Sequence, residues 1–110
     1  MIELRGYIDE NGNKPFADWL EDLDAPAAAK VTIALTRMER GNFSNAKGVG
    51  AGVYEYKIDF GPGFRIYFGK DGDRLVILIG GGSKRSQQKD IASAHTRWAA
   101  YKRRKKLETS

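Results

Sequence analysis

Two neighbouring segments of the sequence alternate between apolar and more polar residues, and this pattern constrains the fold more than any other feature. In residues 54–60 every second side chain is aromatic or aliphatic, and residues 64–68 repeat the pattern after a Gly61-Pro62-Gly63 turn. Successive side chains of a strand point to opposite faces of a sheet, so the two segments are predicted strands of a hairpin with one apolar face. Residues 75–79 are apolar throughout, which predicts the central strand of the sheet, covered on both faces.

Three further segments carry the residue spacing of helices. From Pro15 to Leu23 apolar residues recur at the three- and four-residue intervals that place them on one side of a helix. Asp24 then offers an N-cap for a second helix that ends at Gly41, and a third helix is predicted from about Ser86. The apolar stripe of this last helix comprises Ile91, Ala94, Trp98 and Tyr101.

The remaining segments complete a single predicted domain over residues 1–110. Residues 2–7 alternate and predict a short first strand, whereas residues 42–52 are predicted to form a loop. The run Gly80-Gly81-Gly82 is expected to end the central strand. The predicted order is therefore β-α-α-β-β-β-α, a twisted and mainly antiparallel sheet flanked by helices, in the α+β class.

Charge is distributed unevenly along the chain, whose net charge is +5. Residues 1–24 carry seven acidic and two basic side chains, whereas residues 84–106 carry nine basic side chains and one acidic side chain. Clustered cations bind polyanions because each phosphate that they neutralise releases condensed counterions. The same cations would also suit a solvated surface at the C-terminal end of a helix, so charge alone leaves both interpretations open.

The residue types that are present exclude several classes of site. The chain has no cysteine and a single histidine, His95, so neither a conventional zinc site nor a Ser-His-Asp arrangement can be assembled, and no metal or other cofactor is expected. We expect His95 to be a packing or surface residue. No apolar run approaches 18 residues, which argues against a membrane span, and the lack of cysteine fits a reducing cytoplasm.

Cations from three predicted elements are expected to converge on one face of the sheet. Arg65 and Lys57 lie on facing strands, opposite the apolar side of the hairpin, and Lys84 and Arg85 follow the end of the third strand. Backbone N–H groups at the start of the last helix would add an anion site beside this basic pair. Tyr67, on the same face as Arg65, offers a ring for stacking with a nucleobase.

A structural interpretation of these cations competes with the functional one. Arg65 and Lys57 could form cross-strand ion pairs with Glu55 and Asp59, each worth well under about 1 kcal/mol when exposed. The glycine run before Lys84 lacks the G-x-x-x-x-G-K-[ST] spacing of a nucleotide-binding phosphate loop, so that class of site is rejected. Residue chemistry alone leaves open whether the cations bind a polyanion or stabilise the sheet.

The sequence around the predicted hairpin resembles a known family of proteins. The segments that carry the resemblance are Pro15-Phe16-Ala17-Asp18-Trp19-Leu20, residues 53–68, residues 75–84 and Gln87-Gln88-Lys89-Asp90-Ile91. They are similar to the HigB-like addiction module killer proteins of the RelE/ParE toxin superfamily. The resemblance covers nearly the whole chain, and the fold that it implies, a strand, two helices, three strands and a helix, agrees with the fold predicted from the residue pattern.

The resemblance implies the toxin component of a type II toxin–antitoxin system. RelE-like relatives cut mRNA in the ribosomal A site without a metal and use the RNA 2′-OH as nucleophile, so the ribosome and mRNA are implied partners. Arg65 matches a strand arginine that stabilises the developing phosphorane charge, and Lys57 matches a strand lysine that acts as the base or as a charge stabiliser. Lys84 and Arg85 match the basic pair after the last strand. A cognate antitoxin, of the helix-turn-helix type, and operator DNA bound by the toxin–antitoxin complex are further implied partners.

One departure from the family pattern leaves alternatives open. Some ribonuclease relatives carry a Tyr or His shortly after the basic pair as an acid–base group, but residues 87–91 contain neither, so the acid is Lys84, Arg85 or absent. A ParE-like, non-enzymatic inhibitor of DNA gyrase and a non-catalytic RNA-binding module are therefore alternative functions. The residues expected to contact RNA are Tyr67, Lys89, Arg97, Lys102 and Arg103, the last two in a basic tail over residues 102–110.

Overall fold

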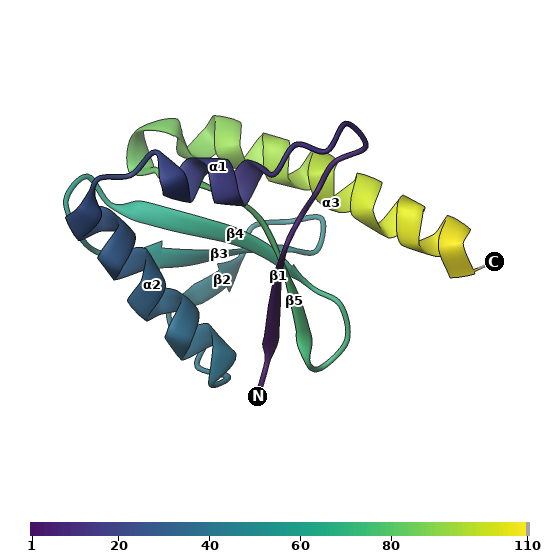
Figure 1. Cartoon of the computed structure of the whole chain (residues 1–110), viewed down its shortest axis with the longest axis horizontal. Helices are drawn as coiled ribbons and strands as arrows, with labels where there is room; N and C mark the ends of the chain where they lie inside the picture. Colours follow the sequence, from purple (N-terminus) through teal and green to yellow (C-terminus); the bar gives the residue numbers. More distant parts are fainter. Residues whose placement is uncertain (110) are drawn as a thin grey trace.

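The computed structural model describes residues 1–109 and contains one five-stranded mixed sheet with three α-helices (Figure 1). The elements are β1 (Glu3–Gly6), α1 (Pro15–Glu21), α2 (Ala25–Glu39), β2 (Ala46–Gly48), β3 (Val53–Ile58), β4 (Phe64–Lys70), β5 (Leu75–Ser83), the 3₁₀ helix η1 (Lys84–Ser86) and α3 (Gln87–Thr109). The strand order is β1-β5-β4-β3-β2, in which only β1 and β5 pair in parallel. The predicted α+β class is confirmed.

Helices α1 and α2 pack together on one face of the sheet. Pro15 occupies the first turn of α1, where a missing N–H leaves no helical hydrogen bond unmade. Asp24 caps α2 by accepting a hydrogen bond from the backbone N–H of Ala27 at 3.0 Å, and Gly41 leaves the helix with a φ of 82°. These start and stop signals lie where the sequence predicts them.

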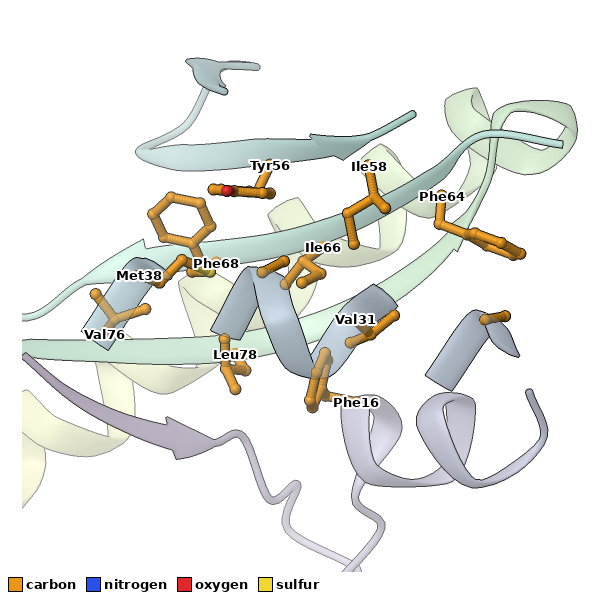
Figure 2. Close-up of a cluster of buried hydrophobic side chains, with 12 residues drawn as sticks. Phe16, Val31, Met38, Tyr56, Ile58, Phe64, Ile66, Phe68, Val76 and Leu78 are labelled. Atoms are coloured by element: carbon orange, nitrogen blue, oxygen red, sulfur yellow. The ribbon is translucent and has the colours of Figure 1, made fainter. Parts of the chain in front are cut away.

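The β3–β4 hairpin confirms the alternation that the sequence shows. Tyr56 pairs with Ile66, and Ile58 pairs with Phe64. Figure 2 shows these four side chains in the core beneath α1 and α2, where Phe16, Val31, Met38, Phe68, Val76 and Leu78 also lie. The intervening residues of both strands therefore face the opposite side of the sheet, which α3 covers.

Strand β5 is buried on both faces, as predicted, but it is not the central strand. Val76 and Leu78 enter the core under α1 and α2, whereas Ile77 and Ile79 pack with Trp98 under α3. Because β1 adds to β5 on its outer side, β4 becomes the middle strand of the five. The prediction that this strand is central was therefore wrong. The apolar composition of a strand indicates that it is buried on both faces, but it does not indicate its position in the strand order.

The glycine run Gly80-Gly81-Gly82 is part of β5 and does not end it. A Cβ atom at Gly81 would overlap the ring of Trp19 in α1, and a Cβ atom at Gly82 would overlap the carboxylate of Asp90 in α3. The run therefore lets helices approach the strand closely from both sides. The predicted strand end was wrong because close packing, and not a turn, requires these glycines.

Two further differences concern segments that were predicted to be irregular. Part of residues 42–52 forms β2, a three-residue edge strand paired with β3, whose glycine- and asparagine-rich surroundings carry no strand signal. The basic tail over residues 102–110 continues α3 as far as Thr109, and residue 110 lies outside the described residues. Within residues 1–109, no helix is at once long enough and apolar enough to cross a membrane.

Candidate functional site

Cations from three elements meet at one end of the sheet. Lys57 on β3 is the register partner of Arg65 on β4, and Arg65 lies opposite Gly82 on β5. The backbone N–H of Lys84 donates to the carbonyl of Gly63 at 2.9 Å, which holds η1 against the β3–β4 turn. Strand pairing and this hydrogen bond bring Lys57, Arg65 and Lys84 together, so the predicted convergence of the three elements is confirmed.

Arg65 is buried and does not lie on an open sheet surface as the sequence suggested. Its side chain is 6% exposed, and its Nε lies 3.3 Å from Oε1 of Glu55, whose side chain is 1% exposed. The carboxylate offsets the cost of burying the guanidinium charge. The ion pair offered as the structural alternative is therefore present for Glu55. The Nη1 of Arg65 is also buried, and it has no hydrogen-bond partner within residues 1–109.

Glu55 connects Arg65 to the start of α3. Nε2 of Gln87 donates to Oε2 of Glu55 at 2.9 Å, so the carboxylate receives one donor from β4 and one from α3. Just before Gln87, the hydroxyl of Ser86 in η1 donates to Oδ2 of Asp90 in α3 at 2.5 Å. Sequence reasoning missed the role of Gln87 because this residue lies 32 positions from Glu55, and their contact exists only once α3 has docked.

Tyr67 is not available for stacking with a base. It is 1% exposed and belongs to the apolar cluster under α3 that contains Ile79 and Trp98. Its buried hydroxyl has no hydrogen-bond partner in the described part of the chain. Burial, followed by the negative charge of Glu55, raises the pKa of the Tyr67 hydroxyl above its ordinary value. The prediction that this ring contacts RNA is wrong, because α3 packs on the face that the strand pattern left open.

Lys57, Lys84 and Arg85 are exposed at this end of the sheet. An open pocket of about 450 Å³ lies beside Lys57, and its other lining residues are Ser44, Asn45, Ala46, Lys47, Glu55 and Asp59. Exposed lysines present mobile point charges, whereas arginine presents a planar fork of donors, and both suit phosphate groups. The exposed part of the site therefore has the chemistry of a phosphate-binding surface.

The cations of α3 differ in their exposure. Lys89, Lys102 and Arg103 are exposed, whereas Arg97 is half-buried and its Nη1 donates to the carbonyl of Ile79 at 3.4 Å. Arg97 and Arg103 border a second pocket, of about 410 Å³, between α3 and the segment that follows β1. Arg97 is thus partly engaged with the sheet, and Lys89, Lys102 and Arg103 remain the predicted RNA contacts on the exposed surface of the helix.

The other end of α3 is anchored to the turn between β4 and β5. The Tyr101 hydroxyl donates to Oδ2 of Asp71 at 2.5 Å, and Lys105 forms an ion pair with the same carboxylate. The hydrogen bonds from Lys105 and Tyr101 hold the pKa of Asp71 below its ordinary value. Burial and the bond to Asp71 raise the pKa of Tyr101 to about 12. The Trp98 and Tyr101 rings stack with centroids 5.1 Å apart, which completes the anchor.

His95 has the packing role expected from the sequence. Its Nε2 lies 2.9 Å from the carbonyl oxygen of Val49, next to the turn between β2 and β3. Across residues 1–109, no group of three or more His, Cys, Asp or Glu side chains is arranged to hold a metal ion. The site at the end of the sheet combines exposed cations with the buried Arg65–Glu55 pair and the amide of Gln87.

Comparison with known proteins finds a bacterial protein of similar sequence. No protein-family model matches the chain. An uncharacterized protein of Haemophilus influenzae is 41% identical over 80 residues, which cover 72% of this chain and 81% of that protein. Identity at this level, over most of both sequences, identifies the two as members of one family. The chain therefore belongs to the same family as this Haemophilus influenzae protein.

Proposed function

We propose that the protein is the toxin of a type II toxin–antitoxin pair of the RelE/ParE type, and that it cuts translated mRNA on the ribosome in the cytoplasm. The observation that carries the proposal is the convergence of Lys57, Arg65 and Lys84 from three elements at one end of the sheet. The observed chain order supports a RelE-like topology, in which β2 is an added edge strand. The resemblance of the hairpin segment to the HigB-like toxins supports it further.

The proposed reaction is a transesterification within the RNA chain. The 2′-OH attacks the adjacent phosphorus, the P–O5′ bond breaks, and the products are a 2′,3′-cyclic phosphate and a 5′-OH end. A base must take the proton of the 2′-OH, an acid must protonate the departing 5′-oxygen, and cations must stabilise the charge that develops on the phosphorane. The reaction balances without an oxidant, a reductant or a second substrate.

The cations at the end of the sheet take these roles. Lys57 is the base or a charge stabiliser, and Lys84 or Arg85 is the acid, because residues 87–91 contain neither a Tyr nor a His. Arg65 contributes its buried positive charge to the stabilisation of the phosphorane, and its Nη1 has no hydrogen-bond partner among residues 1–109. Lys89, Lys102 and Arg103 contact the RNA backbone and make binding dependent on salt.

The proposed function also implies partners for the protein. The ribosome presents the mRNA, and a cognate antitoxin, of the helix-turn-helix type, neutralises the toxin by covering its basic face. The toxin–antitoxin complex binds operator DNA. Basic surface at the sheet end and on α3 supports an acidic or nucleic-acid partner, because opposite charge steers association.

Induced expression in bacteria, with growth followed and transcript ends mapped, tests the proposed function. Wild type should arrest growth and create new cuts inside translated mRNAs, and these cuts should disappear when translation is blocked. Lys57→Ala and Lys84→Ala remove exposed side chains, so each should keep the fold and reduce cutting by about tenfold or more. Lys30→Ala, an exposed lysine of α2, is the matched control and should cut like wild type.

Arg65→Ala belongs in the same series, with its thermal unfolding measured in parallel. Loss of this arginine leaves Glu55 buried without its cationic partner, so reduced activity has to be separated from reduced stability. Growth arrest without mRNA cuts would contradict the endonuclease function. No arrest at all would point to a non-catalytic RNA-binding module.

Inhibition of DNA gyrase without catalysis, in the manner of ParE-like toxins, is a second candidate function that a specific observation favours. Arg65 is nearly inaccessible and already paired with Glu55, and residues 87–91 contain neither a Tyr nor a His as an acid–base group. Neither feature hinders a protein that acts only by binding. DNA damage and filamentation, with intact mRNAs and unchanged behaviour of Lys57→Ala, would select this function over the endonuclease.

A further inference from the structure

Three side chains from three elements form a chain of contacts at the site. Gln87 at the start of α3 donates to one oxygen of Glu55 on β3, and the other oxygen of Glu55 accepts from Nε of Arg65 on β4. Glu55 and Arg65 are both more than nine-tenths buried. The guanidinium is therefore held on its Nε side by a carboxylate that α3 itself holds in place.

The other end of the Arg65 guanidinium lies beside the β3–β4 turn, near the root of the Lys84 side chain. A Cβ atom built at Gly63 would lie 3.7 Å from Nη1 of Arg65 and 3.8 Å from Cβ of Lys84. Nη1 and the root of the Lys84 side chain thus flank the same glycine of the β3–β4 turn. The unpartnered end of Arg65 is next to the residue whose own side chain extends to the surface.

Charge neutralisation alone does not account for this arrangement. A carboxylate opposite the guanidinium could accept from two of its nitrogens at once, and nearly all buried donors in proteins are paired. Here Glu55 takes one donor from Arg65 and one from Gln87, which leaves Nη1 unused. The second oxygen of Glu55 accepts a hydrogen bond from Gln87 in α3, and this bond fixes the orientation of the carboxylate.

We infer that Glu55 and Gln87 are positioning residues for Arg65: they fix its buried guanidinium beside Gly63 and Lys84, where its charge acts on the phosphate of a bound RNA. The inference rests on the proposed endonuclease function and adds two residues that contact no substrate. An arginine side chain has many rotamers, and a donor that is already oriented does not have to be ordered during the reaction. Gln87 acts through Glu55, and Glu55 acts through Arg65.

The test uses the purified full-length protein and ribosomes that carry a short mRNA. Single-turnover cleavage is measured over a range of protein concentrations, which separates the maximal rate from the half-saturating concentration. Gln87→Met keeps the length of the side chain and removes its donor, and Gln88→Met is the matched control at the neighbouring exposed position. Glu55→Gln removes the charge of the buried carboxylate and keeps its shape. Hydrogen exchange at Nε–H of Arg65, followed by NMR in the free protein, reports the orientation of the guanidinium without substrate.

For Gln87→Met we expect the maximal rate to fall about 10- to 100-fold. The half-saturating concentration should change by less than about threefold, because the lost interaction acts only in the transition state. Exchange at Nε–H of Arg65 should become faster in Gln87→Met and in Glu55→Gln. Gln88→Met should match wild type in every measurement.

Other outcomes overturn the inference. An unchanged maximal rate in Gln87→Met, with faster Nε–H exchange, would show that orientation of Arg65 does not matter for cleavage. A higher half-saturating concentration with an unchanged rate would make Gln87 a binding residue. If Glu55→Gln does not fold, the cleavage rate and the Nε–H exchange of Gln87→Met alone decide whether the inference holds. Absence of cleavage by wild type would instead reject the proposed function, and the inference would fall with it.

Discussion

The two faces of the sheet are built differently, although the same strands form both. Among residues 1–109 the buried side chains under α1 and α2 are hydrophobic, and aromatic rings such as Phe16 and Phe68 fill much of the space. Under α3 an apolar cluster around Trp98 is joined by the buried charges of Glu55 and Arg65. One face is thus a uniform core, and the other combines a core with a polar site.

This difference places most of the apolar stabilisation on one face of the sheet and the charged site on the other. Apolar burial is favourable in proportion to area and needs no particular partner, whereas a buried charge is tolerated only with a partner of opposite charge and good hydrogen bonds. The face under α1 and α2 can therefore stabilise the fold, whereas the face under α3 can keep an arginine in a fixed orientation. Three substitutions test how far the two faces differ.

The largest expected loss of stability comes from a substitution in the uniform core under α1 and α2. Phe68→Ala removes a ring that is fully buried and packs against Tyr54 and Phe43 with centroids 5.4 and 5.6 Å away. The free energy of unfolding should fall by about 4 kcal/mol, because both transfer and cavity terms are lost. Urea denaturation measures the change. Ile33→Ala, at a residue of α2 that is 47% exposed, is the control and should cost less than about 1 kcal/mol.

A smaller loss is expected when the polar pair under α3 is broken from one side. Glu55→Leu leaves the Arg65 charge buried without a partner and should lower the free energy of unfolding by about 3 kcal/mol. The double variant Glu55→Leu with Arg65→Met makes this region apolar and should recover most of the loss. A double variant as unstable as the single one would mean that the pair itself, and not the unpaired charge, stabilises the protein.

The smallest effect concerns the anchor of α3 at Asp71. Tyr101→Phe removes a hydrogen bond to a carboxylate and should cost about 1 to 2 kcal/mol near neutral pH. The pKa of Tyr101 is raised to about 12 in the folded protein from an ordinary 10.0. As pH rises through this window the unfolded chain loses the proton first, so the contribution of Tyr101 to stability is lost there.

Thermal unfolding between neutral pH and pH 12 checks the sign of this effect. Wild type should lose stability at the alkaline end, and Tyr101→Phe should lose less. Tyr54→Phe, on the other face, is the control and should retain the wild-type decline. At the acid end the lowered pKa of Asp71 means that its contribution is present above its ordinary value of 3.8 and is lost as pH falls below it. An identical alkaline profile in Tyr101→Phe would contradict the assignment.

Much of the fold follows from local signals in the sequence. The alternation in residues 54–68 predicts the β3–β4 hairpin and its apolar face, and Asp24 and Gly41 mark the ends of α2. Such signals are readable because they depend on a few neighbouring residues: the period of a strand, the capping side chain and the glycine at a helix end. The meeting of Lys57 and Arg65 was predictable for the same reason, since a short hairpin fixes its own register.

The environment of the site was not predictable in this way. Arg65 and Tyr67 occupy the side of the hairpin that the pattern marks as polar, and α3 turns that side into an interior. The glycine run 80–82 looked like a strand end because its packing partners, Trp19 and Asp90, belong to other elements that meet it only in the folded structure. A residue pattern along one element does not state what will pack against it.

The sequence by itself determined the three helices and every strand except β2, which face of the hairpin is apolar, and that cations gather toward the C-terminal half. These properties are encoded by spacing and by composition along the chain. Only the tertiary structure decided that Arg65 is buried, that Glu55 and Gln87 hold it, and that Nη1 is left unpartnered. The physical reason is that burial and hydrogen bonding depend on α3 docking over the sheet, as in the contact between Gln87 and Glu55, 32 positions apart, and no local pattern records that contact.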